Sequence, residues 1–195
     1  SATDTAVCSD EPIPNLVVAG AYVLWYSDTD TSLTNPVWIG DTLSPPDTSV
    51  GTHLYYVLHI DTGVNMCASR PDTATLTIKP VPPLPVVYND TACEGNAVPP
   101  LIALGSNVLW YSDTDTSLLS PVFSGDSLIL IDSAAGTYIY YATQTMLGCE
   151  SPANTGAITI MPSPAAPIAE DVIACDEGAT GVPDLIASGT NITWY

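Results

Sequence analysis

Basic residues are almost absent from this chain. Lys79 and Arg70 stand against 21 acidic residues, so the formal net charge is −19 at pH 7. Proteins bind nucleic acids and anionic lipid surfaces through clusters of Lys and Arg. The composition therefore excludes nucleic acid as a partner and electrostatic attraction to anionic lipid. Two explanations of the negative charge stay open: solubility and self-repulsion outside a cell, and capture of a divalent cation.

Long hydrophobic runs and catalytic motifs are also missing. No stretch approaches the roughly 20 apolar residues of a membrane-spanning helix, and we expect no membrane span. No nucleophile-elbow, zinc-protease or phosphate-loop motif occurs. The two histidines, His53 and His59, are expected to be structural or surface residues, because the repeat described below places Tyr138 and Gln144 at their positions. We predict that the chain is not an enzyme and carries no cofactor, with Ca²⁺ as the one cation to consider.

An internal repeat dominates the sequence. Residues 23–32 and 108–117 are identical, and residues 191–195 begin the same passage a third time. A period of about 85 residues indicates a tandem array of small domains rather than one large core. Pro-rich stretches follow each copy and are typical of short, semi-rigid spacers. The predicted organisation is domain 1 at 1–80, a linker at 81–87, domain 2 at 88–161, a linker at 162–168, and the N-terminal part of domain 3 at 169–195.

Within each copy the apolar pattern favours β-strands. Short apolar or alternating runs recur every 8–12 residues between turn residues, and no window has helical periodicity with caps. About seven short strands around a central Trp predict an all-β fold of immunoglobulin-like β-sandwiches, two complete and one truncated. In the second copy the expected strands are 86–88, 101–104, 108–111, 128–131, 136–144 and 157–160. Ser1 is not the start of a signal peptide, and Tyr195 falls inside an expected strand, so we expect a mature form or a window from a longer protein.

The five cysteines follow the repeat. Cys8, Cys93 and Cys175 align, and so do Cys67 and Cys149. One disulfide per domain, Cys8–Cys67 and Cys93–Cys149, is the simplest interpretation; each would tie the start of a domain to a hairpin at one pole. Each would close about 55–60 residues and contribute roughly 4 kcal/mol in the chain-entropy model. Disulfides persist in oxidising compartments, which indicates a secreted protein, and no C-x-x-C pair supports a metal site instead.

The Ser-Asp-Thr-Asp-Thr-Ser loop is the best candidate for a ligand site. Asp28 and Asp30, and again Asp113 and Asp115, present carboxylates two residues apart. Ca²⁺ takes six to eight oxygen ligands, and two such carboxylates could supply part of the set. Asp and Thr also form turns through their own side-chain hydrogen bonds. A turn and a cation site therefore both remain open.

Aromatic residues recur in both copies. Trp25 and Trp110, with the pairs at 55–56 and 140–141, are most simply core residues alternating with outward-facing Tyr. A carbohydrate-binding platform is the alternative. An aromatic cluster exposed in one copy only would favour binding, whereas the same surface on every copy would favour assembly, as would pairing at exposed sheet edges.

Several motifs of the second copy carry a family resemblance. They are Cys93-Glu-Gly95, Trp110-Tyr-Ser-Asp113, the segment from Gly136 to Gln144, and Gly148-Cys-Glu-Ser-Pro152. Together they resemble the Ig-like repeat found in tandem in very large surface and secreted proteins of Bacteroidota. The first copy departs from this pattern at 64–71 and at Cys8-Ser-Asp10. The resemblance implies stalks, adhesin shafts or fibre modules, often exported by the type IX secretion system, and it implies no catalytic residues.

Most aspartates are followed directly by Thr or Ser, and some continue into a small or aliphatic residue. That triplet resembles the O-glycosylation acceptor of exported Bacteroidota proteins; plain turn formation is the alternative. The residues that would carry sugar are Thr5, Thr42, Thr73, Thr91, Ser127 and Ser133. Asn89 and Asn191 match the N-glycan sequon, which is a weak signal in a bacterial protein.

These observations lead to one leading expectation for function. The chain is expected to be a structural repeat segment of an extracellular bacterial surface fibre, self-associating or contacting neighbouring repeats. The alternative is a stalk or binding module of a cell-surface adhesin that recognises glycan or another cell. A third class, an accessory domain of an enzyme, would need a catalytic domain elsewhere.

Overall fold

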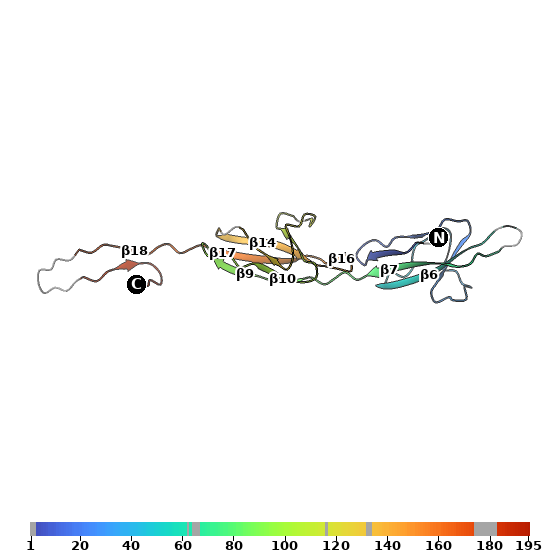
Figure 1. The fold of residues 1–195 in the computed structure, drawn as a ribbon, viewed down its shortest axis with the longest axis horizontal. Helices are drawn as coiled ribbons and strands as arrows, with labels where there is room; N and C mark the ends of the chain where they lie inside the picture. Colours follow the sequence, from blue (N-terminus) through green and yellow to red (C-terminus); the bar gives the residue numbers. More distant parts are fainter. Residues whose placement is uncertain (1–2, 62, 64–66, 116, 132–133, 174–182) are drawn as a thin grey trace.

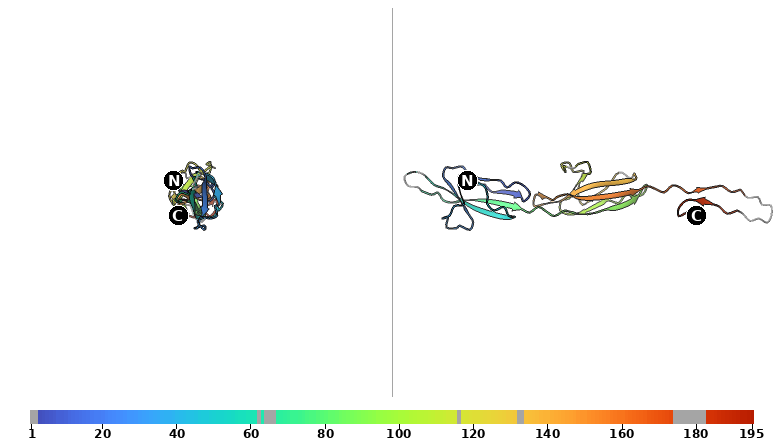
Figure 2. Two further views of the ribbon diagram at one scale, coloured as in Figure 1. Left: turned by 90° about the vertical axis from the view of Figure 1, so that its right-hand side faces the viewer. Right: turned by 180° about the vertical axis from the view of Figure 1, so that it is seen from behind.

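The protein is two β-sandwich modules arranged end to end, followed by a short third segment (Figures 1 and 2). The computed structural model describes residues 3–61, 63, 67–115, 117–131, 134–173 and 183–195. Viewed along the long axis the modules superimpose on one compact outline (Figure 2), so the chain forms a straight rod. We call residues 5–79 the first module, 80–85 the linker and 86–161 the second module.

Every regular element of the described residues is a β-strand, which confirms the all-β prediction. Short alternating runs interrupted by Pro, Gly and Asp-Thr turns leave no segment with helical periodicity. The strands of the first module are β1 (Thr5–Cys8), β2 (Leu16–Val17), β3 (Val23–Ser27), β4 (Trp38–Ile39), β5 (Thr42–Leu43), β6 (Gly51–His59) and β7 (Asp72–Lys79). Those of the second module are β8 (Val86–Tyr88), β9 (Asp90–Cys93), β10 (Leu101–Leu104), β11 (Leu109–Ser112), β12 (Phe123–Ser124), β13 (Ser127–Leu128), β14 (Gly136–Thr143), β15 (Thr145–Met146), β16 (Cys149–Glu150) and β17 (Asn154–Met161).

The two modules share one sheet topology. The larger sheet has the order β1-β7-β6-β3-β4 in the first module and β12-β11-β14-β17-β9 in the second, so the strands correspond one to one. The opposing sheet is β2-β5 in the first module and β13-β10-β8 in the second. In each module the first strand of the larger sheet runs parallel to the last, β1 beside β7 and β9 beside β17. This arrangement is the immunoglobulin-like sandwich that the sequence predicted.

A tryptophan fills the centre of each sandwich. Trp25 and Trp110 are both 0% exposed, and each indole Nε1 donates to a glycine carbonyl, Gly40 O or Gly125 O, at 2.9 Å. Alternation along β7 and β17 places further aliphatic side chains beside them. These residues are core residues, as predicted, and they are not available as a carbohydrate platform.

The third segment contributes two short strands. β18 (Ile168–Ala169) pairs with β19 (Ala187–Ser188) in antiparallel fashion. β18 occupies the sequence position that β8 occupies in the second module. Cys175 lies outside the described residues. Among the residues that the structure describes, no helix is long and apolar enough to cross a membrane.

Candidate functional site: the junction between successive modules

A disulfide crosses the junction between the two modules. Cys8 Sγ of the first module bonds to Cys149 Sγ of the second, over a sequence separation of 141 residues. The Cα atoms are 5.7 Å apart, within the usual range for a bridge. The other two described cysteines, Cys67 and Cys93, are exposed and lie outside this bond. The predicted pairs Cys8–Cys67 and Cys93–Cys149 are therefore wrong.

Strand direction explains the correction. Cys8 ends β1 beside Lys79, the last residue of the parallel strand β7, and therefore lies at the pole that faces the next module. Cys67 precedes Asp72, the first residue of β7, and lies at the opposite pole. The length of this strand separates the two thiols by roughly 25 Å at about 3.4 Å per residue, far beyond disulfide reach. We call the two ends the trailing pole (Cys8) and the leading pole (Cys67).

A tight hairpin presents Cys149 at the leading pole of the second module. β15 and β16 pair through Met146 and Cys149, leaving a two-residue turn at Leu147 and Gly148. Both turn residues have positive φ, 55° and 82°, as in the type I′ turns that match strand twist. The turn aims the Leu147 carbonyl at the first module, where Lys79 Nζ donates to it at 2.9 Å. One of the two basic residues of the chain therefore supports the junction.

The linker is also held by side chains of the second module. Gln144 Nε2 donates to the Pro83 carbonyl at 2.7 Å, and Asn154 Nδ2 donates to the Pro85 carbonyl at 2.9 Å. Gln144 Oε1 accepts from the Ser106 N–H at 2.8 Å, which fixes the amide in place. Prolines have no N–H, so their carbonyls are the polar groups that a neighbour can bind. The linker is thus bound along its length rather than free to bend.

An exposed carboxylate that reaches two buried hydroxyl groups fixes the strand that carries Cys149. Glu150 Oε1 accepts hydrogen bonds from Tyr111 Oη at 3.0 Å and from Thr143 Oγ1 at 2.6 Å. Burial raises the pKa of Tyr111 and the hydrogen bond to Glu150 adds to the rise, so the phenol stays protonated as a donor at neutral pH. These contacts position β16, and with it the bridging sulfur.

Most of this junction could not be predicted from the sequence. Lys79, Gln144, Leu147 and Glu150 had no predicted role at a junction, although Gln144 and Glu150 belong to the motifs of the family resemblance. Two local signals were readable: a lone Lys directly before the Pro-rich linker, and a Leu-Gly pair directly before a cysteine. These signals become meaningful only when the poles of the modules are known.

The aspartate loops form turns in both modules. Asp30 Oδ2 accepts the N–H groups of Thr34 (3.0 Å) and Asn35 (2.7 Å), and Oδ1 accepts the Ser32 hydroxyl. The Asn35 N–H and then the Ser32 hydroxyl lower the pKa of Asp30. These contacts close the loop without a cation. In the part of the chain that the structure describes, no group of three or more His, Cys, Asp or Glu could hold a metal ion.

The second loop repeats the first. Asp115 Oδ2 accepts the Ser120 N–H at 2.8 Å and Oδ1 accepts the Ser117 hydroxyl at 2.9 Å. The Ser120 N–H lowers the pKa of Asp115 most. Asp28 and Asp113 lie two residues earlier in their loops. A Ca²⁺ site at these four aspartates stays an untested prediction.

The Asp-Thr/Ser triplets lie at the starts of strands. The candidate glycosylation residues Thr5, Thr42, Thr73, Thr91 and Ser127 lie in β1, β5, β7, β9 and β13, with exposed or half-buried side chains. The residue after several of them enters a core, as Ala74 and Leu128 do. Strand alternation therefore accounts for the small or aliphatic third residue. Ser133 lies outside the described residues.

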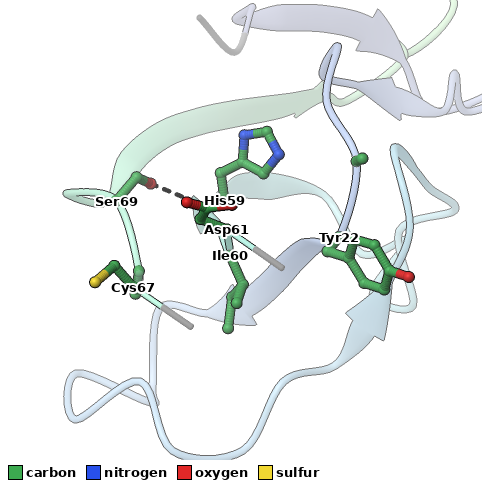
Figure 3. A pocket seen from close by; sticks show the side chains of 8 residues that line it. Tyr22, His59, Ile60, Asp61, Cys67 and Ser69 are labelled. Carbon is green, nitrogen blue, oxygen red and sulfur yellow. Dashed lines mark hydrogen bonds between the residues drawn. The ribbon is translucent and has the colours of Figure 1, made fainter. Parts of the chain in front are cut away.

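The two histidines contact the protein rather than each other. His53 Nε2 lies 2.8 Å from the Ser49 carbonyl, and its Nδ1 lies 3.5 Å from Asp47 Oδ2. His59 lies at the leading pole of the first module and lines a cavity there (Figure 3). The His53 contact is structural.

Exposed apolar residues recur on the edge strands of both modules. Trp38 in β4 is 51% exposed, and Phe123 in β12, at the equivalent position, is 41% exposed. Val37 and Val122 precede them and are exposed as well. β4 and β12 end their sheets, so one side of each has no strand partner in the sheet order of the described residues. The same surface therefore appears on each copy, which the sequence reasoning associated with assembly.

No family model matches this chain, and no curated protein matches it. Solved structures with a similar arrangement include the N-terminal Ig1-2 module of the Drosophila receptor protein tyrosine phosphatase DLAR (14% identity, TM-score 0.29, 82% of this chain and 95% of that chain). The fibronectin(III)-like modules of Clostridium thermocellum CbhA are similar at 11% identity (TM-score 0.42, 82% and 90%). Human CDH23 EC21-23 is similar at 14% identity (TM-score 0.37, 94% and 81%). At these identities and TM-scores, none of these likenesses assigns a ligand or a role to the chain.

Proposed function

We propose that this chain is a force-transmitting segment of an extracellular fibre, in which a disulfide joins successive β-sandwich modules to one another. The observation that carries the proposal is the Cys8–Cys149 disulfide between modules. A bridge within one module would stabilise that module alone. A bridge between modules fixes their separation and orientation, which is what a rod requires.

The position of the bridge determines the path of a pulling force. Tension applied to the two ends reaches Cys8, crosses the sulfur–sulfur bond and continues from Cys149. Residues 9–148 lie outside that path and cannot be extended. Strands β2 to β15 are therefore shielded from stretching, whereas β1 and β17, which contribute Val7 and Ile158 to the two cores, carry the tension.

Two further properties support an extracellular fibre. A disulfide of this kind persists in an oxidising compartment, and a net charge of −19 keeps the rod hydrated and separate from other anionic surfaces. The exposed Trp38 and Phe123 recur on both modules and offer lateral contacts between rods, which favours assembly over recognition by one specialised module. O-glycans on Thr5, Thr42, Thr73, Thr91, Ser127 and Ser133 would hydrate the same surface.

Single-molecule pulling from the two ends of the chain tests this function. With the bridge intact, only residues outside 8–149 lengthen. Reduction then releases the loop between two cysteines whose sequence separation is 141, a contour gain of about 480 Å at roughly 3.4 Å per residue.

The matched control is Cys8→Ser, which should show the full contour length without reductant. Extension of residues 9–148 in the oxidised wild-type chain would contradict the proposal, because the force would then be passing through the modules. Cys93→Ser removes a cysteine outside the bridge and is expected to pull like the wild type.

A further inference from the structure

The one lysine of the chain lies at the junction and hydrogen-bonds to a neutral partner. Lys79 Nζ donates to the Leu147 carbonyl of the second module at 2.9 Å. The sequence holds 21 acidic residues, yet among the residues that the structure describes no carboxylate forms an ion pair with this lysine. A contact that served only to neutralise charge would use a carboxylate. A peptide carbonyl of the next module instead fixes a position.

Cys8 and Lys79 form one side of the junction. They are register partners at the ends of the parallel strands β1 and β7. The residues before them, Val7 and Ile78, belong to the core of the first module, and side chains alternate along a strand. Cys8 and Lys79 therefore both point away from that core. The Ser9 N–H donates to the Lys79 carbonyl at 2.9 Å, which holds the lysine backbone beside the cysteine.

The two-residue turn of the second module receives both side chains. Lys79 Nζ binds the Leu147 carbonyl, and Cys8 Sγ lies 3.8 Å from the carbonyl oxygen of Gly148. Cys149, which forms the bridge, follows this turn directly. Gly148 has a φ of 82°, and a Cβ built on it would stand 3.7 Å from Lys79 Nζ, in ordinary contact. The ammonium group therefore lies against the turn whose next residue is the bridging cysteine.

The second module has a different side chain at the position of Lys79. Its strand β9 ends with Cys93 beside Met161, as β1 ends with Cys8 beside Lys79. The Glu94 N–H donates to the Met161 carbonyl at 2.8 Å, which is the same backbone contact as in the first module. The two modules thus share the backbone arrangement here and differ in the side chain next to the cysteine. The lysine contact is a property of the junction rather than of the fold.

We propose that Lys79 is a positioning residue for the bridge: it docks the trailing pole of the first module on the turn at Leu147 and Gly148, and so brings Cys8 to Cys149 before oxidation. The junction then forms in two stages, a non-covalent contact followed by the disulfide. The hydrogen bonds of the linker to Gln144 and Asn154 belong to the first stage. This inference deepens the proposed function and rests on it, because it concerns how the same bridge forms.

The bridge forms with an external disulfide as oxidant. The Cys8 and Cys149 thiols lose two protons and two electrons as the sulfur–sulfur bond forms, and oxidised glutathione takes them up and leaves as two glutathione thiols. The first exchange produces a mixed disulfide, which the second cysteine must then attack. Docking raises the effective concentration of that second thiol. Lys79 therefore acts on the equilibrium between glutathione and the bridge, without taking part in the exchange.

The test compares full-length chains at equilibrium in glutathione redox buffers at neutral pH. Acid quenching, alkylation and peptide mapping give the ratio of bridged to reduced Cys8–Cys149, and hence the effective concentration of the pair. Lys79→Met gives the first module the side chain of the second, and we expect the effective concentration to fall about fivefold, which corresponds to about 1 kcal/mol. Arg70→Met is the matched control: it changes the net charge equally, precedes β7 at the opposite pole, and should keep the wild-type value.

Amide exchange of the reduced chains separates docking from the stability of the first module. Lys79→Met should leave exchange along β6 and β7 unchanged. Faster exchange there would overturn the inference, because the lysine would then be stabilising its own module. An unchanged effective concentration in Lys79→Met, or an equal fall in Arg70→Met, would overturn it as well. Any of these results with a Cys8–Cys149 bridge in the wild type leaves the proposed function standing, whereas a wild type without that bridge contradicts both.

Discussion

At the scale of single residues, Glu150 has the largest predicted effect on the junction. Its carboxylate receives the hydroxyl groups of Tyr111 and Thr143, and both of those residues are almost wholly buried. A buried donor that loses its acceptor costs the full desolvation of that group. The same side chain follows Cys149 directly, so the stability of the second module and the position of the bridge are linked.

Glu150→Ala is expected to destabilise the second module by about 1–3 kcal/mol, because two buried hydroxyl groups lose their acceptor. Glu150→Gln keeps a carbonyl oxygen and should cost less. Amide exchange along β14 measures the effect. The first module is an internal control: Leu58 and Ala68 stand at the positions of Thr143 and Glu150, and exchange along β6 should not change. Equal loss of protection in both modules would contradict this assignment.

At the scale of elements, the sequence predicted strands better than it predicted their directions. The alternation of apolar and polar residues around Trp25 and Trp110 was sufficient to identify the sandwich. It placed both indoles on the apolar face of a strand, and an apolar face of that kind packs against a second sheet. Nothing in the local pattern indicated that β1 runs parallel to β7 and therefore ends at the trailing pole. The Cys8–Cys67 prediction failed for that reason: pairing by repeat alignment cannot tell a partner in the same module from one in the next.

The aspartate loops are elements whose stability should depend on pH. Hydrogen bonds hold the pKa of Asp30 and of Asp115 below the ordinary value of 3.8. A depressed carboxyl pKa contributes stability that is present above the ordinary value and is lost as pH falls through the folded value. We therefore expect the Asn35 and Ser120 amides to lose protection only below about pH 4.

Asp115→Asn should abolish this pH dependence at Ser120 and leave Asn35 unchanged. Asp113→Asn is the matched control, because it removes the same charge from the same loop and should leave the Ser120 titration in place. Protection at Ser120 that disappeared near neutral pH, or that required added Ca²⁺, would show that the carboxylate contacts do not close the loop.

At the scale of the whole molecule, one covalent bond turns two small domains into a rod. Modules of this size are marginally stable alone. A bridge between cysteines with a sequence separation of 141 restricts the unfolded chain by about 5 kcal/mol in the chain-entropy model. The hydrogen bonds from Gln144 and Asn154 to the linker also restrict the motion of one module relative to the other. The tandem repeat was readable from sequence, whereas the covalent link between its units depended on the three-dimensional placement of the poles.

The pairing of the cysteines tests the central claim most directly. Trypsin is unsuitable, since both basic residues precede proline, as Arg70-Pro71 and Lys79-Pro80. The folded chain should instead be alkylated, digested with pepsin at acid pH, where disulfide exchange is suppressed, and mapped by mass spectrometry. The account predicts a peptide containing Cys8 joined to one containing Cys149, with Cys67 and Cys93 alkylated. Peptides joined as Cys8–Cys67 and Cys93–Cys149 would contradict it. Each module would then contain its own disulfide, and only the linker would connect the two modules.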